Sequence, residues 1–94
     1  MGGAYFLYTL VKCNPPREPN GRFFGRAIYM LYEQSAPLGK PKKLSDKELI
    51  ASGSDLELIV NAQYPELRCY LIRKGKKLKG GQHIRIGCQR YSSV

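Results

Sequence analysis

A run near the N-terminus limits the fold of this chain most strongly. Residues 4–13 (AYFLYTLVKC) are almost all aromatic, β-branched or otherwise apolar, which is typical of a strand without a solvent-facing side. The run is much shorter than the roughly 18 apolar residues of a membrane-spanning helix. It also lacks the basic flank and the cleavage site of a signal peptide. We therefore predict a central strand that is covered on both faces.

The next segments predict a turn and a second strand. Residues 14–21 contain three prolines and an Asn-Gly pair, which favour a loop that closes on a turn. Residues 22–33 fit a strand paired with the first one. From Arg26 on they also fit a helix with Ile28, Leu31 and Tyr32 on one stripe. We favour the strand because a turn precedes it and because it is rich in tyrosine. Residues 35–43, with two prolines, a glycine and three lysines, indicate a loop.

The middle of the chain predicts two short helices. Residues 45–48 (SDKE) have the form of a capping box, in which the serine hydroxyl and the glutamate bond to first-turn amides. A helix over 46–52 would follow and end at Gly53. Residues 54–57 (SDLE) repeat the pattern. Residues 56–62 then fit either a second helix or a strand, and we favour the helix. Pro65 ends the segment.

The last quarter of the chain predicts a β-hairpin with a cationic tip. Residues 67–73 read as a strand, and residues 74–81 as a flexible connection rich in lysine and glycine. Residues 82–91 alternate in the manner of a half-buried antiparallel strand. Its apolar face would hold Ile84, Ile86 and Cys88, and its polar face His83, Arg85 and Gln89.

These elements together predict one small α+β domain over residues 1–94. We expect an antiparallel sheet of about four strands, one or two short helices on one face of the sheet, and a basic C-terminal β-hairpin. The chain of 94 residues is long enough for a single core. It has no tryptophan, so seven tyrosines and three phenylalanines supply the aromatic volume.

The charge of the chain is strongly positive and unevenly spread. The formal net charge is +9. Residues 1–43 hold seven basic and two acidic side chains, residues 44–66 one basic and five acidic, and residues 67–94 eight basic and none acidic. A block of one sign attracts phosphates and accelerates encounter with a polyanion. The basic C-terminal block therefore indicates a nucleic-acid-binding surface, without distinguishing DNA from RNA.

The candidate contacts lie along the predicted hairpin. Lysine and arginine would neutralise phosphates and release counterions, a two-stranded ribbon can enter a groove, and tyrosine can stack on unpaired bases. In the competing interpretation, the lysines only protect an edge hairpin from aggregation. The predicted contact residues are Arg68, Arg73, Lys74, Lys76, Lys77, Lys79, His83, Arg85, Arg90, Tyr70 and Tyr91.

A second class of function is a protein-binding one. A short basic chain without a catalytic motif also suits an accessory or inhibitor protein of the kind that viruses and phages direct against a host protein. Such a protein would bind an acidic surface or occupy a nucleic-acid-binding channel.

No catalytic or metal site is predicted. His83 and Cys88 would face opposite sides of one strand, and no acidic residues are paired for acid–base chemistry. Cys13, Cys69 and Cys88 form no CxxC motif, so we expect three reduced, mostly buried thiols and no zinc. We therefore expect a non-enzymatic protein without a cofactor, in a reducing intracellular compartment, either cytoplasm or nucleus.

The first 26 residues partly resemble the opening of a GIY-YIG nuclease domain. Residues 3–5 (GAY) lead into an apolar strand, and residues 22–26 (RFFGR) follow the loop. The resemblance implies two motifs on adjacent strands that frame a catalytic tyrosine, with an arginine and a metal-binding glutamate on later helices. Tyr5, Phe23 and Gly25 would match the first tyrosine, the second tyrosine and the closing glycine. The sequence departs from the pattern at Phe23, which lacks the hydroxyl group.

Overall fold

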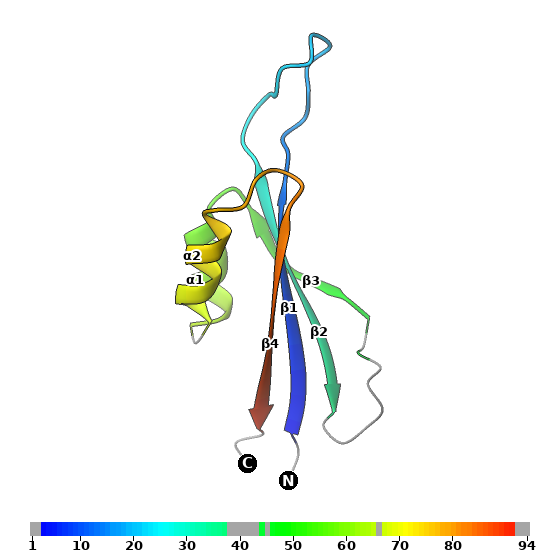
Figure 1. The fold of residues 1–94 in the computed structure, drawn as a ribbon, viewed down its shortest axis with the longest axis vertical. Helices are drawn as coiled ribbons and strands as arrows, with labels where there is room; N and C mark the ends of the chain where they lie inside the picture. The colour runs from blue at the N-terminus through cyan, green and yellow to red at the C-terminus, as the bar shows by residue number, and fades with distance from the viewer. Residues whose placement is uncertain (1–2, 38–43, 45, 66, 92–94) are drawn as a thin grey trace.

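The fold is described by a computed structural model that covers residues 3–37, 44, 46–65 and 67–91, with the backbone alone for residues 3, 4, 37, 90 and 91. Four strands and two helices follow one another along the chain (Figure 1). They are β1 (Gly3–Cys13), β2 (Ile28–Pro37), β3 (Glu48–Gly53), α1 (Leu56–Gln63), α2 (Arg68–Gly75) and β4 (His83–Tyr91).

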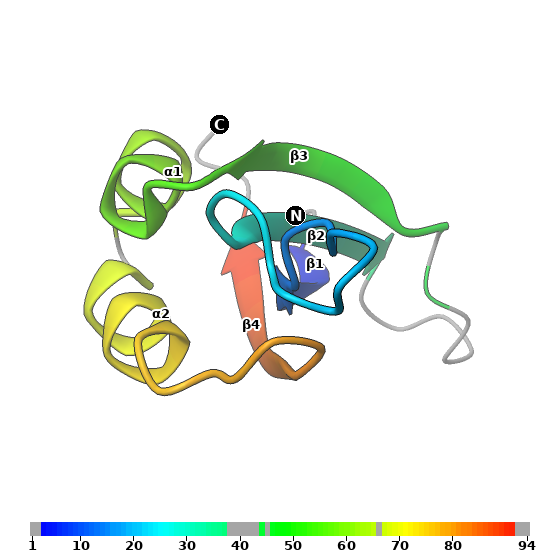
Figure 2. The same ribbon diagram turned by 90° about the horizontal axis from the view of Figure 1, so that it is seen from above.

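The strands form one antiparallel sheet in the order β3-β2-β1-β4. β1 is central, as predicted, and pairs along its length with β2 and β4. Both helices lie on the same side of the sheet (Figure 2). The prediction of a small α+β fold with helices on one face is therefore confirmed. Helices cover β1 on one face only, because no described helix packs on the second face, although Thr9 on that second face is still only 2% exposed.

The side chains of the sheet divide between these two faces according to the strand register. Tyr8 and Leu10 of β1 pair with Ile86 and Ile84 of β4 and point toward the helices, where they join the core. Antiparallel partners share a face. Thr9 and its partner Arg85 therefore lie on the opposite face, which we call the open face.

Residues 14–27 form a projection between β1 and β2, which we call the β1–β2 arm (Figure 1). Its tip is a tight turn in which the Gly21 N–H donates to the Glu18 carbonyl at 2.9 Å, and Gly21 has φ +87°. The predicted turn and the predicted strand interpretation of residues 22–33 are both confirmed, although the strand begins only at Ile28. The arm contributes to an elongated molecule of 56 × 25 × 18 Å.

The helix predicted over residues 46–52 is wrong, because β3 occupies Glu48–Gly53. Ser45 of the supposed capping box lies outside the described residues. β3 pairs with the free edge of β2, with a bulge between Leu31 and Tyr32. Backbone pairing at that edge satisfies donors and acceptors of both strands. This long-range gain outweighs the weak local preference of so short a segment.

α1 confirms the favoured helix interpretation of residues 56–62. Its N-cap is Asp55, whose Oδ1 accepts a hydrogen bond from the Leu58 N–H at 3.1 Å. Leu56, Ile59 and Val60 are the buried residues of the helix. Ile59 and Val60 follow Leu56 by three and four residues, so all three side chains lie on one side of the helix, the side that faces the sheet.

The strand predicted over residues 67–73 is also wrong, because Arg68–Gly75 is α2. The buried residues of this segment are Leu71, Gly75 and Leu78. They are separated by four and then three residues, so they lie on one side of the helix and of the turn that follows it. β4 is confirmed, with Ile84, Ile86 and Cys88 half-buried and His83, Arg85 and Gln89 exposed. The basic segment therefore joins a helix to a strand and is not the tip of a β-hairpin.

Gly75 allows α2 to lie close to β1. A Cβ atom at this position would come within 2.8 Å of both Leu10 Cδ2 and Leu56 Cδ2. Leu10 and Leu71 are fully buried, and Leu56 is 6% exposed. This contact closes the core between the two helices and the sheet. The other members of the buried cluster are Tyr8, Leu31, Ile59, Val60, Tyr64 and Leu78.

The N-cap of α1 gives a direct test of the local fold. Asp55→Ala should lower the free energy of unfolding by about 1 kcal/mol, because a first-turn amide loses its acceptor. Ser54→Ala is the matched control and should change stability by less than about 0.5 kcal/mol. Urea denaturation of both variants measures the difference. Equal losses would contradict the assignment of Asp55 as the cap.

The close approach at Gly75 gives a second test. Gly75→Val should lower the free energy of unfolding by about 2 kcal/mol or more, because the added atoms overlap buried leucines. Lys74→Val places the same side chain at the neighbouring exposed position of α2 and should cost about 0.5 kcal/mol, from helix propensity alone. Thermal and urea unfolding would measure both. A Gly75→Val protein as stable as the Lys74→Val protein would refute the packing of α2 on β1.

Candidate nucleic-acid interface

α2 and the turn after it present a continuous set of exposed cations. The core takes Leu71, Gly75 and Leu78 from this segment, so the polar residues between them are left on the solvent side of the helix. We call this set the α2 cation surface. Its members, all exposed, are Arg68, Arg73, Lys74, Lys76, Lys77 and Lys79.

The turn between α2 and β4 is held by hydrogen bonds at both ends. The Leu78 N–H donates to the Gly75 carbonyl at 3.1 Å, and the Lys79 N–H donates to Gln82 Oε1 at 2.9 Å. The Gly81 N–H then donates to the carbonyl of Lys12 in β1 at 2.7 Å. The lysines of this turn are therefore carried on a backbone fixed to the sheet, which differs from the flexible connection that the sequence predicted.

The two glycines of the turn serve different purposes, close packing at Gly80 and backbone conformation at Gly81. An added Cβ at Gly80 would overlap the side-chain amide of Asn14, the first residue of the β1–β2 arm. Gly81 has φ +87°, which is a conformation that favours glycine. Gly80 thus brings the end of the α2 cation surface against the base of the arm.

One member of the surface is paired with an acid. Lys76 Nζ lies 2.8 Å from Glu57 Oε1 of α1, and both side chains are largely exposed. An ion pair so exposed is screened by water and contributes little to stability. Among the described residues it is the only salt bridge between a basic and an acidic side chain. The remaining cations of the surface are thus available for a ligand.

The other predicted contact residues lie elsewhere. Arg85 and His83 pair with Thr9 and Val11 and project from the open face of the sheet, away from the helices. Tyr70 is half-buried and packs against the core. The backbone of residues 90 and 91 belongs to β4, whereas the side chains of Arg90 and Tyr91 lie outside the described residues. The structure therefore brings together the cations of α2 and its turn, and separates them from those of β4.

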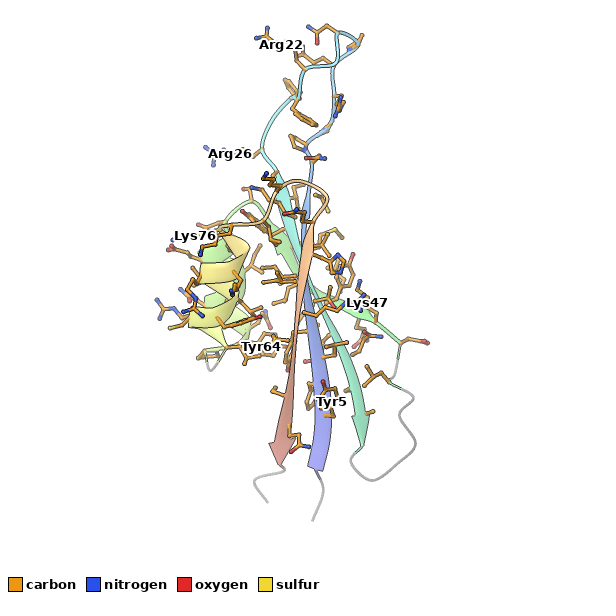
Figure 3. The ribbon with its side chains drawn as sticks, in the orientation of Figure 1. Tyr5, Arg22, Arg26, Lys47, Tyr64 and Lys76 are labelled. Atoms are coloured by element: carbon orange, nitrogen blue, oxygen red, sulfur yellow. The ribbon has the colours of Figure 1, made fainter. Side chains whose placement is uncertain are left out.

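The β1–β2 arm carries a second cluster, whose residues are not among the predicted contacts. Arg17, Arg22 and Arg26 are exposed there, and Glu18 is the one acid among residues 14–27. Phe23 and Phe24 are 49% and 65% exposed. Figure 3 shows Arg22, Arg26 and Lys76 on the same side of the long axis, which is the side that carries the helices. The signal in the sequence is a pair of phenylalanines flanked by arginines in residues 22–26 (RFFGR).

The structure does not bring the two motifs of the nuclease resemblance together. Tyr5 pairs with Ala36 and Gln89, whereas Phe23 forms a bridge with Arg17 inside the arm. In Figure 3, Tyr5 lies toward the end of the molecule opposite to Arg22. The segment after the second motif is strand β2, where the resemblance implies a helix. The geometry that the resemblance implies is therefore wrong at these positions.

Tyr5 instead lies on the open face against β4. A Cβ atom at Gly87 would overlap the phenol group of Tyr5, so the glycine leaves room for the ring on the neighbouring strand. The side chain of Tyr5 is 36% exposed. Lys47, whose Nζ lies 4.1 Å from the centre of the Tyr32 ring, is on the same side of the molecule as the open face (Figure 3).

The described thiols and acids form no cluster suited to a metal. Within the described part of the chain, no three histidine, cysteine or carboxylate side chains are grouped together. Cys13 and Cys88 are half-buried free thiols and Cys69 is an exposed one, so the expectation of mostly buried thiols is wrong. No described helix is both long and apolar enough to cross a membrane.

We compared the chain with protein families, with curated proteins and with solved structures, and none of the three comparisons gave a significant match.

Proposed function

We propose that this protein is a non-enzymatic nucleic-acid-binding module whose α2 cation surface contacts the phosphate backbone. The observation that carries the proposal is the exposure of Arg73, Lys74, Lys77 and Lys79 on one helix and its turn, without a described carboxylate partner. Binding of phosphates by such side chains releases counterions, and this supplies most of the affinity of a sequence-independent nucleic-acid ligand.

The placement of the acids supports this proposal. Glu33 accepts a hydrogen bond from the Tyr64 hydroxyl at 2.5 Å, and Asp55 caps α1. Both carboxylates therefore have structural partners away from the α2 cation surface. Glu57 is the single described acid that approaches this surface closely enough to pair with it. The positive potential of the surface is thus largely uncompensated by the protein itself.

The rigidity of the surface also supports binding. The turn that holds Lys77 and Lys79 is hydrogen-bonded to β1 and β4, and Leu78 is anchored in the core at 7% exposed. A ligand therefore meets cations whose backbone is already ordered, and less conformational entropy is lost on binding. The expected contacts are to phosphate, which positions a nucleic acid without reading its sequence.

The first test uses two double variants of equal charge. Lys74→Gln/Lys77→Gln should reduce the magnitude of the slope of log K against log [salt] by about two units, one for each lost phosphate contact. Lys47→Gln/Arg85→Gln removes the same charge from the opposite face of the sheet and should leave the slope nearly unchanged. Fluorescence anisotropy with a labelled 20-base-pair DNA duplex, between about 50 and 200 mM salt, measures both.

Two results would contradict the proposal. One is an equal loss in the two double variants, which would mean that only the total charge matters. The other is binding by the wild-type protein that does not depend on salt. Co-purification with one stoichiometric protein that persists after nuclease treatment would instead favour the accessory-protein function.

A single substitution should strengthen binding. Glu57→Gln frees Lys76 from its ion pair and removes a negative charge beside the surface, so the affinity for the duplex should rise several-fold at low salt. Stability should change by less than about 1 kcal/mol, because the pair is exposed. Glu48→Gln on the edge strand β3 is the matched control. A weaker complex for Glu57→Gln than for Glu48→Gln would contradict the role of Lys76 at the interface.

A further inference from the structure

The β1–β2 arm is an ordered ribbon, even though most of its residues belong to no strand. The Glu18 N–H donates to the Arg22 carbonyl at 2.7 Å, and the Phe24 N–H donates to the Pro16 carbonyl, also at 2.7 Å. The Arg17 guanidinium lies 4.4 Å from the centre of the Phe23 ring, within the range of a cation–π contact. The two sides of the arm are thus fastened together along its length, beyond the end of the core.

Phe24 is largely exposed and does not belong to the hydrophobic core. It is 65% exposed, whereas one face of the neighbouring Phe23 is covered by Arg17. Gly25, with φ +85°, turns the chain directly after it. A large apolar side chain displayed on a narrow projection resembles in its chemistry the wedges that proteins insert between base pairs from the minor groove of DNA.

The cations of the arm continue the α2 cation surface. Gly80, at the end of the α2 turn, packs against Asn14 at the base of the arm. Arg22 and Arg26 lie on the same side as Lys76 at successive heights along the long axis (Figure 3). These cations occupy the part of the axis between the tip of the arm and α2 (Figure 3). A row of charge along one side of a narrow molecule suits a straight, stiff polyanion.

We propose that the β1–β2 arm enters the minor groove of a DNA duplex that is held by the α2 cation surface, with Phe24 inserted at a base step and Arg22 and Arg26 on the flanking phosphates. The inference rests on the proposed function and adds to it the class of ligand and a second contact element. Insertion of Phe24 partly unstacks one base step and kinks the duplex. Flexible steps such as TA and CA should therefore be preferred.

A duplex fits these features better than a single strand. A single strand is bound by aromatic side chains that line a groove and stack on successive bases. The exposed aromatic side chains of the arm, Phe23 and Phe24, lie instead on a narrow ribbon, and Arg17 already covers one face of Phe23. Duplex RNA also fits less well, because its major groove is too deep and narrow for side chains and its minor groove is wide and shallow. The row of cations and the exposed Phe24 on a narrow projection together favour duplex DNA.

The test compares two residues of equal exposure. Phe24 on the arm is 65% exposed and Leu58 on α1 is 66% exposed. Phe24→Ala and Leu58→Ala are each mixed with a 20-base-pair DNA duplex that carries 2-aminopurine at a central TA step. The fluorescence of 2-aminopurine rises when the base loses its stacking neighbours, and anisotropy of a labelled end reports affinity. Circular dichroism confirms that both variants are folded.

Wild type and Leu58→Ala should bind equally well and raise the 2-aminopurine signal. Phe24→Ala should abolish that rise and weaken binding about tenfold, as is typical when an aromatic residue stacked on a base is removed. Arg22→Gln/Arg26→Gln should lower the magnitude of the salt slope by about two units. Unchanged fluorescence with wild type, or an equal response from Phe24→Ala and wild type, would overturn the proposed insertion.

The design separates this inference from the function on which it rests. If wild type binds the duplex with a salt slope that depends on Lys74 and Lys77, but Phe24→Ala behaves as wild type, then the arm is not a groove-entering element and the proposed function stands. If wild type does not bind the duplex, the proposed function fails as well. Tighter binding of single-stranded DNA or of duplex RNA of the same length would assign a different ligand.

Discussion

The close contact between α2 and β1 at Gly75 is the constraint on which the rest of the molecule depends. Because a side chain there would overlap Leu10 and Leu56, the helix can approach the sheet only where a glycine stands. This approach buries Leu71 completely and Leu78 almost completely. Once those two residues face inward, the helical repeat turns the lysines and arginines between them toward solvent. The same packing therefore builds the core and displays the charge.

β1 connects the remaining parts of the structure. Its two edges are hydrogen-bonded to β2 and β4, and its end at Lys12 is bonded to the turn that follows α2. The β1–β2 arm starts directly after this point, where Asn14 packs against Gly80. The α2 cation surface and the arm, which are far apart in the sequence, are thus fixed to one another through a single strand. This link makes a combined interface physically reasonable.

The distribution of charge in space differs from its distribution along the chain. The C-terminal block of basic residues is one block only in sequence, because the alternation of β4 sends Arg85 and His83 to the open face. The turn after α2 lies instead against the base of the arm, where Gly80 packs on Asn14. The arginines of the arm come from the first third of the chain. An ion pair with Glu57 neutralises only Lys76.

The sequence alone determined the features that arise from neighbouring residues. The apolar run of β1, the Asn-Gly turn, the alternation of β4 and the helix after Asp55 all follow from local preferences, and all were predicted. It did not determine β3, because a capping pattern before a short apolar segment suits either a helix or a strand. It did not determine α2 either, because an apolar stretch between two arginines is equally ambiguous. The tertiary structure decided these elements: the edge of β2 offered backbone groups with which β3 pairs, and a helix places Gly75 against Leu10 of β1. It also decided the exposure of the aromatic residues, since only packing reveals that Phe24 is 65% exposed while Tyr8 and Tyr64 are buried in the core.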